Sequence, residues 1–445
     1  MRLRPLLVFA AVFTVGGALL WVANLSSSRP NTDRPTSVGG VGPEVRRRRA
    51  DPGPMEPAPR GQDGPLFVRI DGQASVDTYA AGGGARHGVK SRLAGHFTAL
   101  DEAFTHYRVD QLTLEVLDPL TQEVIETLTA RSGTFRVEPG GGAHALTIAN
   151  GGQVLLEEVQ FVRHTQHAFA PLTLHAPRLE LLLSVNELRS IEDDAVEFTG
   201  NGLAGGGQGL LFEGESGLLR LERGGEVVMQ RPQGGEMYFS TPGKGPLEIR
   251  QTGPSGTPGS MEALAVEGAR LILKGDSPGQ VDARTLRLVG HSVDGTVILE
   301  SAEAEGQVLV VSGDGRYSGA RAQLKLDESG ELETLILEEN PTAQFTILRG
   351  GGVATRILSK GRGPLTVAIS DTGTRFTLVG PGFAEALGEN LKIHAEGTLQ
   401  GIFDSERTHA TILARERVRV IQGANRPETD TLDAVFLAGE EIGRA

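Results

Sequence analysis

Residues 196–209 read VEFTGNGLAGGGQG, and the fold class depends on the residues that come after their first glycines. Positions 200–205 match the G-x-G-x-x-G spacing of a dinucleotide-binding turn. That motif requires a helix directly after the glycines, because the pyrophosphate binds at the helix N-terminus. Residues 205–209 are four glycines and a glutamine, and such a run disfavours a helix start. We interpret the stretch as a strand end, a flexible turn and the next strand, and it does not indicate a nucleotide site.

The rest of the body, from residue 65 onward, repeats this alternation of apolar and polar residues. Alternating segments include LTLEV at 112–116, LRL at 219–221 and FTL at 376–378. A period of two is typical of half-buried β-strands, and these runs end in Gly, Asp-Gly, Pro-Gly or Asn-Pro turn signals. Short helical pieces are expected only near 383–388 and 433–441. The sequence therefore predicts an all-β body.

Composition supports that class and removes several kinds of site. The 445 residues include 61 glycines and no cysteine. Glycine at this level without a collagen period indicates many turns and short segments. The absence of cysteine excludes disulfides, thiolate metal sites and cysteine nucleophiles.

The N-terminal 25 residues differ from the rest. A basic start, MRLRP, precedes an uncharged apolar run at 6–25, about the length that spans a bilayer as a helix. A cleaved signal peptide is the alternative, but its apolar region is usually about 7–15 residues and ends in small residues. Trp21 stands where a small residue would be needed. We expect an uncleaved anchor with an exported body, although arginines on both sides leave the orientation undecided.

Residues 26–64 form a linker rich in Pro, Ser, Gly and Arg, which cannot bury enough apolar surface to order itself. Its four arginines at 46–49 are interpreted as a solvated patch or, alternatively, as a contact with anionic headgroups. Residues 1–64 hold nine Arg and five Asp or Glu, which leaves 34 basic and 51 acidic residues, net −17, for 65–445. An acidic body argues against nucleic acid as a partner.

A Gly-Pro-Leu motif recurs at 64–66, 245–247 and 363–365. Proline suits the first position of an edge strand, where its missing N–H does no harm. We therefore expect three β modules that open at these positions.

No arrangement of side chains predicts catalysis. His164, His167 and His175 are the closest histidines, but their strand parities differ, so a solvated loop is favoured over a metal site. The acidic residues 192–194 lack the spacing of a calcium loop. No G-x-S-x-G, H-E-x-x-H or P-loop motif is present. We expect a protein that is not an enzyme and that has no catalytic residue, metal or cofactor.

Three segments carry a family resemblance. Residues 107–118 and 128–133, joined through a turn at 118–122, resemble a strand, a D-x-x-x-G-type turn and a strand ending in L-x-A-x-x-A/G. Residues 196–202 resemble a V-x-F-x-G-N-V strand, and 322–326 with 335–341 resemble an A-x-x-L-x-L … I-x-L-x-G-x-P unit. These are patterns of the periplasmic bridge family of lipopolysaccharide export (LptC-like, with LptA/OstA-like repeats).

The resemblance implies a transmembrane helix at 1–25, a disordered linker at 26–64, an LptC-like jelly-roll module at 65–245 and OstA-like modules at 246–363 and 364–445. Such modules are twisted jelly rolls, open along one side, that stack by edge-strand pairing. The implied function is transfer of lipopolysaccharide or a similar lipid from a single-pass inner-membrane anchor through the periplasm. The implied partners are that lipid, an inner-membrane transporter complex and other OstA-like proteins.

Two other functions stay open: an anchored structural or adhesive β-repeat protein of the cell envelope without lipid cargo, and an anchored glycan-acting enzyme. For the lipid function, the candidate groove-lining residues share one parity on their strands. They are Leu112, Leu114, Val196, Phe198, Leu219, Leu221, Leu286, Leu288, Leu324, Leu326, Phe376 and Leu378. Inward apolar side chains are equally what a filled core needs, so an open groove and a closed core both fit.

Overall fold

The protein forms one antiparallel β-sheet of 27 strands, with no helix among the residues that the computed structural model describes. Those residues are 72–79, 89–118, 121–139, 146–148, 152–164, 171–183, 186–200, 202–214, 216–231, 234–243, 245–251, 259–275, 278–293, 296–313, 315–348, 354–387, 391–406 and 408–437. The expected anchor and linker lie outside them. Within them, no helix is long and apolar enough to cross a membrane.

The first half of the sheet contains β1 (Gly72–Tyr79), β2 (Val89–Ala99), β3 (His106–Leu117), β4 (Val124–Pro139), β5 (Leu146–Ile148), β6 (Gln153–Arg163), β7 (Leu172–Leu182), β8 (Glu187–Ser190), β9 (Ala195–Gly200), β10 (Leu203–Glu213), β11 (Leu218–Gln230), β12 (Glu236–Ser240) and β13 (Leu247–Gln251). The second half contains β14 (Gly259–Leu273), β15 (Gly279–Val293), β16 (Thr296–Ser312), β17 (Gly315–Leu326), β18 (Leu332–Glu338), β19 (Thr342–Leu348), β20 (Ala354–Gly361), β21 (Leu365–Ser370), β22 (Gly373–Val379), β23 (Gly382–Leu387), β24 (Leu391–Ala395), β25 (Thr398–Asp404), β26 (His409–Gln422) and β27 (Glu428–Leu437).

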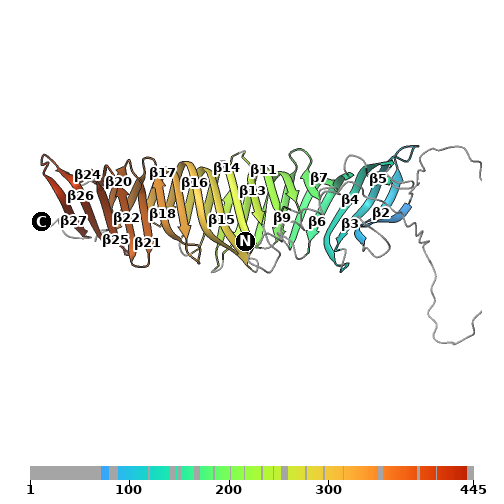
Figure 1. The fold of residues 1–445 in the computed structure, drawn as a ribbon, viewed down its shortest axis with the longest axis horizontal. Helices are drawn as coiled ribbons and strands as arrows, with labels where there is room; N and C mark the ends of the chain where they lie inside the picture. The colour runs from blue at the N-terminus through green and yellow to red at the C-terminus, as the bar shows by residue number, and fades with distance from the viewer. Residues whose placement is uncertain are drawn as a thin grey trace, which may run out of the picture.

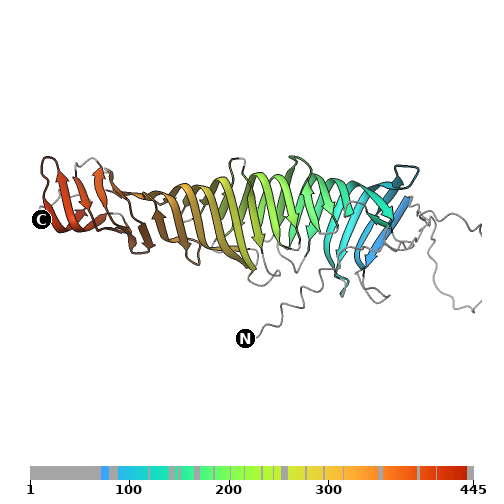
Figure 2. The same cartoon turned by 45° about the horizontal axis from the view of Figure 1, so that its top comes forward.

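The strands lie across the long axis of an elongated body, and the chain advances steadily from one end to the other (Figure 1). Each strand pairs only with strands at most three positions away in sequence. In the described residues, β1 pairs only with β2, and β27 pairs only with β26. Figure 2 shows the same elongated body from a second direction. Within the described residues, β1 is therefore the end strand at the N-terminal end of the sheet and β27 the end strand at the C-terminal end.

The single sheet is folded lengthwise into two walls. Wall A contains β8, β13, β18, β21, β22 and β25, and wall B contains β9, β12, β19, β20, β23 and β24. The long strands cross from one wall to the other. In β14, for example, the first half pairs with β13 on wall A and the second half pairs with β12 on wall B.

The crossing points form one long edge of the body, which we call the spine. Most long strands change register there, as β14 does between Val266 and Ala269. Several strands that run from wall A to wall B place a polar residue with positive φ at the crossing: Gln111, Glu158, Glu267, Gln307 and Glu416. At Gln111, Glu267, Gln307 and Glu416 the pairing also changes register. These four β-bulges bend the strand without ending its pairing.

The hairpin turns form the other long edge, as two rims, rim A on wall A and rim B on wall B. No strand pairing among the described residues joins the two rims. The sheet is therefore continuous around the spine, and in the part of the chain that the structure describes no backbone pairing closes it on the opposite side.

The Gly-Pro pairs expected to open edge strands lie elsewhere. Pro246 and Pro364 stand at corners of the spine, just before β13 and β21, and each of those strands is paired on both sides. The edge-strand interpretation of these two positions was wrong. Proline is tolerated there because the ladder begins one residue later, so its missing N–H leaves no gap. The first pair, at 64–65, lies outside the described residues, and the module boundaries stay predictions.

Two local expectations are also corrected. Residues 205–209 lie inside β10 and do not form a turn; only residues 201–202 connect β9 to β10. Glycine fits this segment because a Cβ on Gly205 would lie 2.3 Å from the Glu226 carbonyl oxygen, and one on Gly206 would lie 2.6 Å from that of Val196. The short helices expected near 383–388 and 433–441 were wrong where they can be compared, since β23 covers 383–387 and β27 covers 433–437. Residue 388 and residues 438–441 lie outside the described residues.

The core lies between the walls as one continuous apolar cluster that runs through the body. Aromatic contacts show the two walls meeting. Phe345 of wall B stacks on Phe376 and Phe403 of wall A, with ring centroids 5.1 and 4.3 Å apart. Phe161 of wall B packs on Phe212 of wall A at 5.5 Å.

Candidate functional site

All twelve candidate groove-lining residues point into the space between the walls and are buried. Four belong to wall B: Leu112, Leu114, Val196 and Phe198. Eight belong to wall A: Leu219, Leu221, Leu286, Leu288, Leu324, Leu326, Phe376 and Leu378. They come from both walls and face one another, so the structure brings them into one interior.

The polar residues between them lie outside. Glu197, Arg287 and Lys325 are exposed, and Thr113, Glu115, Arg220 and Thr377 are half-buried. Arg287 forms ion pairs with Glu262 and Glu303 of the neighbouring strands, at 2.8 and 3.5 Å. The outer face is therefore polar, with ion pairs between neighbouring strands, whereas the inner face is apolar. This is the arrangement that alternation along each strand produces.

The interior is filled by side chains. Near the N-terminal end, Leu93, Leu112, Leu114 and Leu156 help to line an apolar void of about 20 Å³. A void of that size holds about one water molecule. Further along, Leu221, Leu288 and Phe376 are fully shielded from solvent. At these places the described side chains of the two walls leave no space for an acyl chain.

A buried ion pair closes the rims at one point. Arg163 ends β6 on rim B, and its Nε donates to Glu126 Oε1 at 2.8 Å. Arg163 Nη1 also donates to the Gly214 carbonyl on rim A at 3.3 Å, and Asn186 of rim A donates to Glu126 Oε2 at 3.3 Å. The side chains of Arg163 and Glu126 are only 2% and 4% exposed. We call these four residues the Arg163 clamp.

A second arginine joins the rims further along. Arg231, in the β11–β12 turn of rim B, is buried and donates through Nη2 to the Ser329 carbonyl of rim A at 2.9 Å. Its Nη1 contacts the Lys274 carbonyl at 3.4 Å, and its buried Nε has no hydrogen-bond partner in the described residues. We call Arg231, Lys274 and Ser329 the Arg231 clamp.

The rim A turn at 327–331, whose Ser329 carbonyl accepts from Arg231, is held in place by hydrogen bonds. The Asp327 carboxylate accepts from the Ser329 hydroxyl at 2.6 Å and from the amides of Ser329 and Glu331, both at 2.9 Å. Burial opposes ionisation of Asp327, but these donors outweigh it and hold its pKa below the ordinary value. The Ser329 carbonyl is thus held in a fixed position.

A groove lies on the outside, near the C-terminal end. This groove of about 960 Å³ is lined by residues of β20, β23, β24, β26 and β27, and it is mostly polar. Arg417 and Arg419 are ion-paired there to Glu396 and Glu428, at 3.1 and 2.6 Å. Two of the cations that line the groove are thus paired with adjacent acids.

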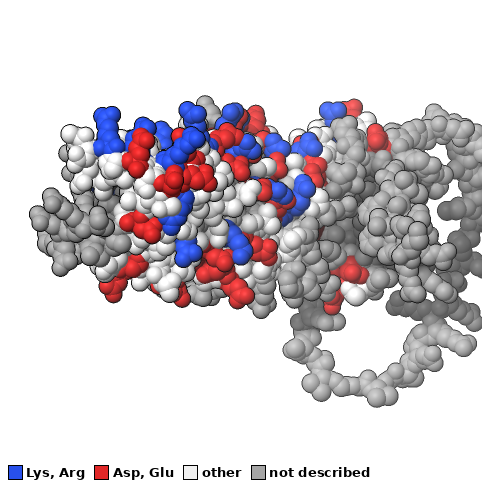
Figure 3. Space-filling view, turned by 60° about the vertical axis from the view of Figure 1, so that its left-hand side comes forward, with Lys and Arg blue, Asp and Glu red and all other residues white. Residues whose placement is uncertain are grey.

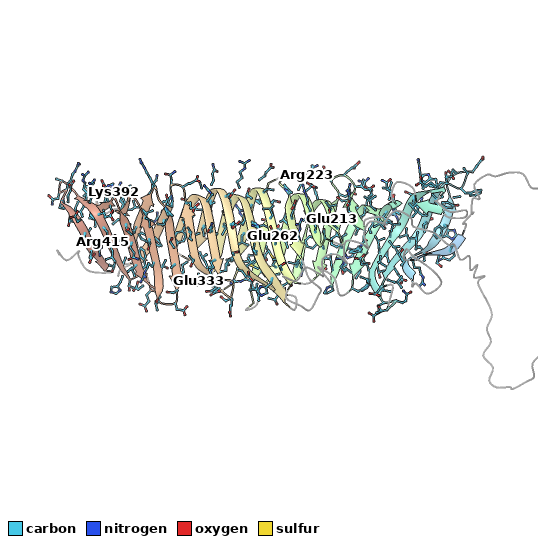
Figure 4. All side chains as sticks on the ribbon, in the orientation of Figure 1. Glu213, Arg223, Glu262, Glu333, Lys392 and Arg415 are labelled. Atoms are coloured by element: carbon cyan, nitrogen blue, oxygen red, sulfur yellow. The ribbon has the colours of Figure 1, made fainter. Side chains whose placement is uncertain are left out.

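Charge follows the spine. Arg131 contacts Glu158 at 2.6 Å, Arg223 contacts Asp193 at 2.6 Å, and Arg321 pairs with Glu339. Figure 4 places Arg223 on the upper margin of the body and Glu333, beside a rim turn, on the lower one. In Figure 3, Lys and Arg gather along that same upper margin, with Asp and Glu among and below them.

The histidines within the described ranges form no metal site. His164 and His175 are exposed, and His167 lies outside the described residues. His164 Nε2 contacts the Thr127 hydroxyl at 2.9 Å. No group of three or more His, Asp or Glu side chains in the described ranges is arranged to hold a metal ion.

The sequence matches no family model and no curated protein. The resemblance to the lipopolysaccharide-export bridge family therefore stays a hypothesis.

The two clamps join residues that no local sequence pattern brings together. Arg163 and Glu126 are 37 residues apart, and Arg231 and Ser329 are 98 apart. One signal was present: Arg163 continues the buried parity of Val159 and Phe161, where alternation predicts an apolar residue. A charged residue in an inward position is a sign of a buried pair.

Proposed function

We propose that the protein is a membrane-anchored lipid-transfer bridge that carries lipopolysaccharide or a similar acylated lipid between its two walls. One observation supports this most: an apolar interior runs the length of a sheet whose rims, as far as the structure describes them, are not paired through their backbones. Walls joined only by side-chain contacts can separate without breaking a strand ladder. In finer detail, we propose stacked, twisted OstA-like jelly rolls.

The energetics of such a carrier are balanced. Separating the walls exposes apolar side chains, and an acyl chain inserted between them covers the same surface again. Each buried CH₂ contributes about 0.8 kcal/mol, so a chain of a dozen carbons gains on the order of 10 kcal/mol. That gain offsets the loss of contacts between walls, such as the stacking of Phe345 on Phe403.

The two ends of the sheet suit assembly with similar proteins. In the described residues β1 and β27 each pair on one side only, which leaves N–H and C=O groups available to another strand. We propose that other OstA-like proteins and an inner-membrane transporter complex meet these ends, and that residues 1–25 hold the body at the inner membrane, facing the periplasm. Mass spectrometry of the native N-terminus tests the anchor, which fails if the mature chain begins near residue 24–30.

A structural or adhesive repeat protein is the second candidate, and the filled interior favours it. Residues such as Leu288 and Phe376 are completely buried by protein alone. A rigid rod with a closed core spans distance without cargo. The two functions differ in whether the interior ever contacts lipid.

Photo-crosslinking in intact cells separates these functions. A photo-reactive residue at Phe198 or Leu288 faces the interior, and matched controls at Glu197 and Arg287 face outward on the same strands. The lipid bridge predicts capture of acyl chains from the inner positions alone. The proposal is wrong if neither inner position captures lipid while the protein is folded at the membrane.

A further inference from the structure

We propose that the Arg163 and Arg231 clamps are positioning devices that decide where the rims part and the interior becomes accessible to lipid. This inference rests on the proposed lipid-carrying function, but it makes a separate claim about the movement of the walls. Both clamps span the two rims, and each is built from an arginine on rim B and a backbone carbonyl on rim A.

The position of the first clamp relates it to the interior. The Arg163 guanidinium lies over the ring of Phe212, with Cζ 5.0 Å from the ring centroid. Phe212 packs in turn on Phe161 of the opposite wall. Arg163 thus covers an aromatic contact between the walls, so an acyl chain that passes the rim here must displace it.

Space around this clamp is tight. A Cβ on Gly214 would lie 2.5 Å from Arg163 Nη2 and 2.8 Å from Asn186 Nδ2. The glycine therefore lets rim A approach close enough for its carbonyl to accept from the arginine. The contact depends on the two rims being together, because Arg163 reaches Gly214 only across the gap.

The second clamp has the same construction without an acidic partner. Arg231 donates to two carbonyls, one on its own rim at Lys274 and one on the opposite rim at Ser329. When the rims separate, the Arg231 guanidinium and the Ser329 carbonyl are hydrated by water, so opening leaves neither group without a hydrogen-bond partner. Arginine is suited to this reversible role because its planar fork serves several acceptors at once.

The chain contains no cysteine, so pairs of spin labels can be placed without background. One pair, His164→Cys with Ser216→Cys, spans the rims at the first clamp, where both residues are exposed. A second pair, Gln230→Cys with Glu328→Cys, spans them at the second.

A control pair on one wall, Glu303→Cys with Lys325→Cys, reports on the strand ladder alone. Distances are measured by pulsed electron paramagnetic resonance on the full chain.

The clamps are weakened by three changes. Arg163→Met with Glu126→Gln removes the ion pair without leaving a charge buried. Arg163→Lys keeps a charge beside Glu126 but shortens the reach to Gly214, so it tests the clamp in a chain that retains the pair. Arg231→Met acts on the second clamp. Arg287→Met, which removes an exposed pair on the outer face, is the matched control.

We expect each clamp variant to lengthen the cross-rim distance at its own position by on the order of 5 Å, half the spacing of about 10 Å between two packed sheets. The control pair and Arg287→Met should show no change. The clamp inference is overturned if the cross-rim distances in all three clamp variants equal those of the unmodified chain.

Lipid capture is scored separately, with the photo-reactive residue at Phe198 in each variant. Rims that open without capture support the clamps and contradict the proposed lipid function. Rims that stay closed while capture is normal contradict the clamps and leave the lipid function supported. Wider rims with increased capture support both.

Discussion

The spine and the rims carry the same kind of ion pair in opposite surroundings. At the spine, Arg131 and Glu157 are 60% and 50% exposed, on a bend where the backbone ladder is already continuous. At the rims, Arg163 and Glu126 are almost fully buried at an edge where no strand pairing in the described residues joins the walls. An exposed pair gains little because water screens it, whereas a buried pair costs much if it is broken. A single side chain therefore has more influence on the shape of the sheet at the rims than at the spine.

The largest effect should come from breaking the buried pair on one side. Arg163→Met leaves Glu126 buried without its cation and should destabilise the surrounding strands by about 3–5 kcal/mol. Hydrogen exchange of the amides in β4 and β6 measures this as faster local opening.

The double variant Arg163→Met with Glu126→Gln serves as the control, because it removes both charges and should recover much of that loss. Equal exchange in the single variant and the unmodified chain would show that the pair is not buried in solution.

A smaller effect should follow from crowding the same clamp. Gly214→Ala places a methyl group against the Arg163 guanidinium and the Asn186 amide, which forces rim A outward at a cost of about 1–3 kcal/mol. Gly279→Ala is the matched control on rim B, since its Cβ would meet nothing closer than 3.5 Å. Hydrogen exchange of the amides in β4 and β6 should be faster in Gly214→Ala than in Gly279→Ala. Equal rates in the two variants would show that the close approach of Gly214 to Arg163 does not fix the position of rim A.

The rim A turn that contains Asp404 belongs to neither clamp, and its contribution to the free energy of unfolding should depend on pH. Asp404 is partly desolvated, but donors from Thr408 and His409 lower its pKa to about 2 from the ordinary 3.8. The ionised form is therefore favoured by folding, so its stabilisation is present above pH 3.8 and is lost as pH falls towards 2.

Asp404→Asn should accordingly reduce stability at neutral pH, and the difference from the unmodified chain should shrink between about pH 4 and about pH 2. Urea unfolding at several pH values measures it. A difference that does not vary with pH would mean that the carboxylate charge has no part in holding this turn.

The smallest effect is expected at the spine. Arg131→Met removes ion pairs with Glu157 and Glu158 that face water. Hydrogen exchange around the bend should change little, and any change should disappear in high salt because exposed charges are screened. An increase in exchange as large as that caused by Arg163→Met would show that ion pairs at the spine and at the rims contribute equally to local stability.

Strand alternation could be predicted from sequence because it depends on single strands. Leu219, Arg220 and Leu221 place their side chains by parity alone, whichever strands lie beside them. The same reasoning could not tell a turn from a strand at 205–209, since both suit glycine. Only the closeness of Glu226 and Val196 across the sheet decides between them.

The interior and its closures depend on partners that are distant in sequence. Parity places Phe376 on the inner face but does not show that Phe345 of the other wall stacks on it. Similarly, Pro246 marks a corner rather than an edge strand, because β11 and β14 pair on both sides of β13. The clamps depend on which turns of rim A lie opposite which turns of rim B. No pattern within a single strand contains that information.

Pairing between strands at most three positions apart has a consequence for the order of folding. Each strand can join the ladder as soon as its neighbours are available, so the body can assemble progressively from its N-terminal end. The clamps cannot form in that way. Arg231 must wait until the turn containing Ser329, 98 residues later, has been made. The rims are therefore the last part of the molecule to close, and a growing chain passes through a stage in which its newest apolar wall is still uncovered.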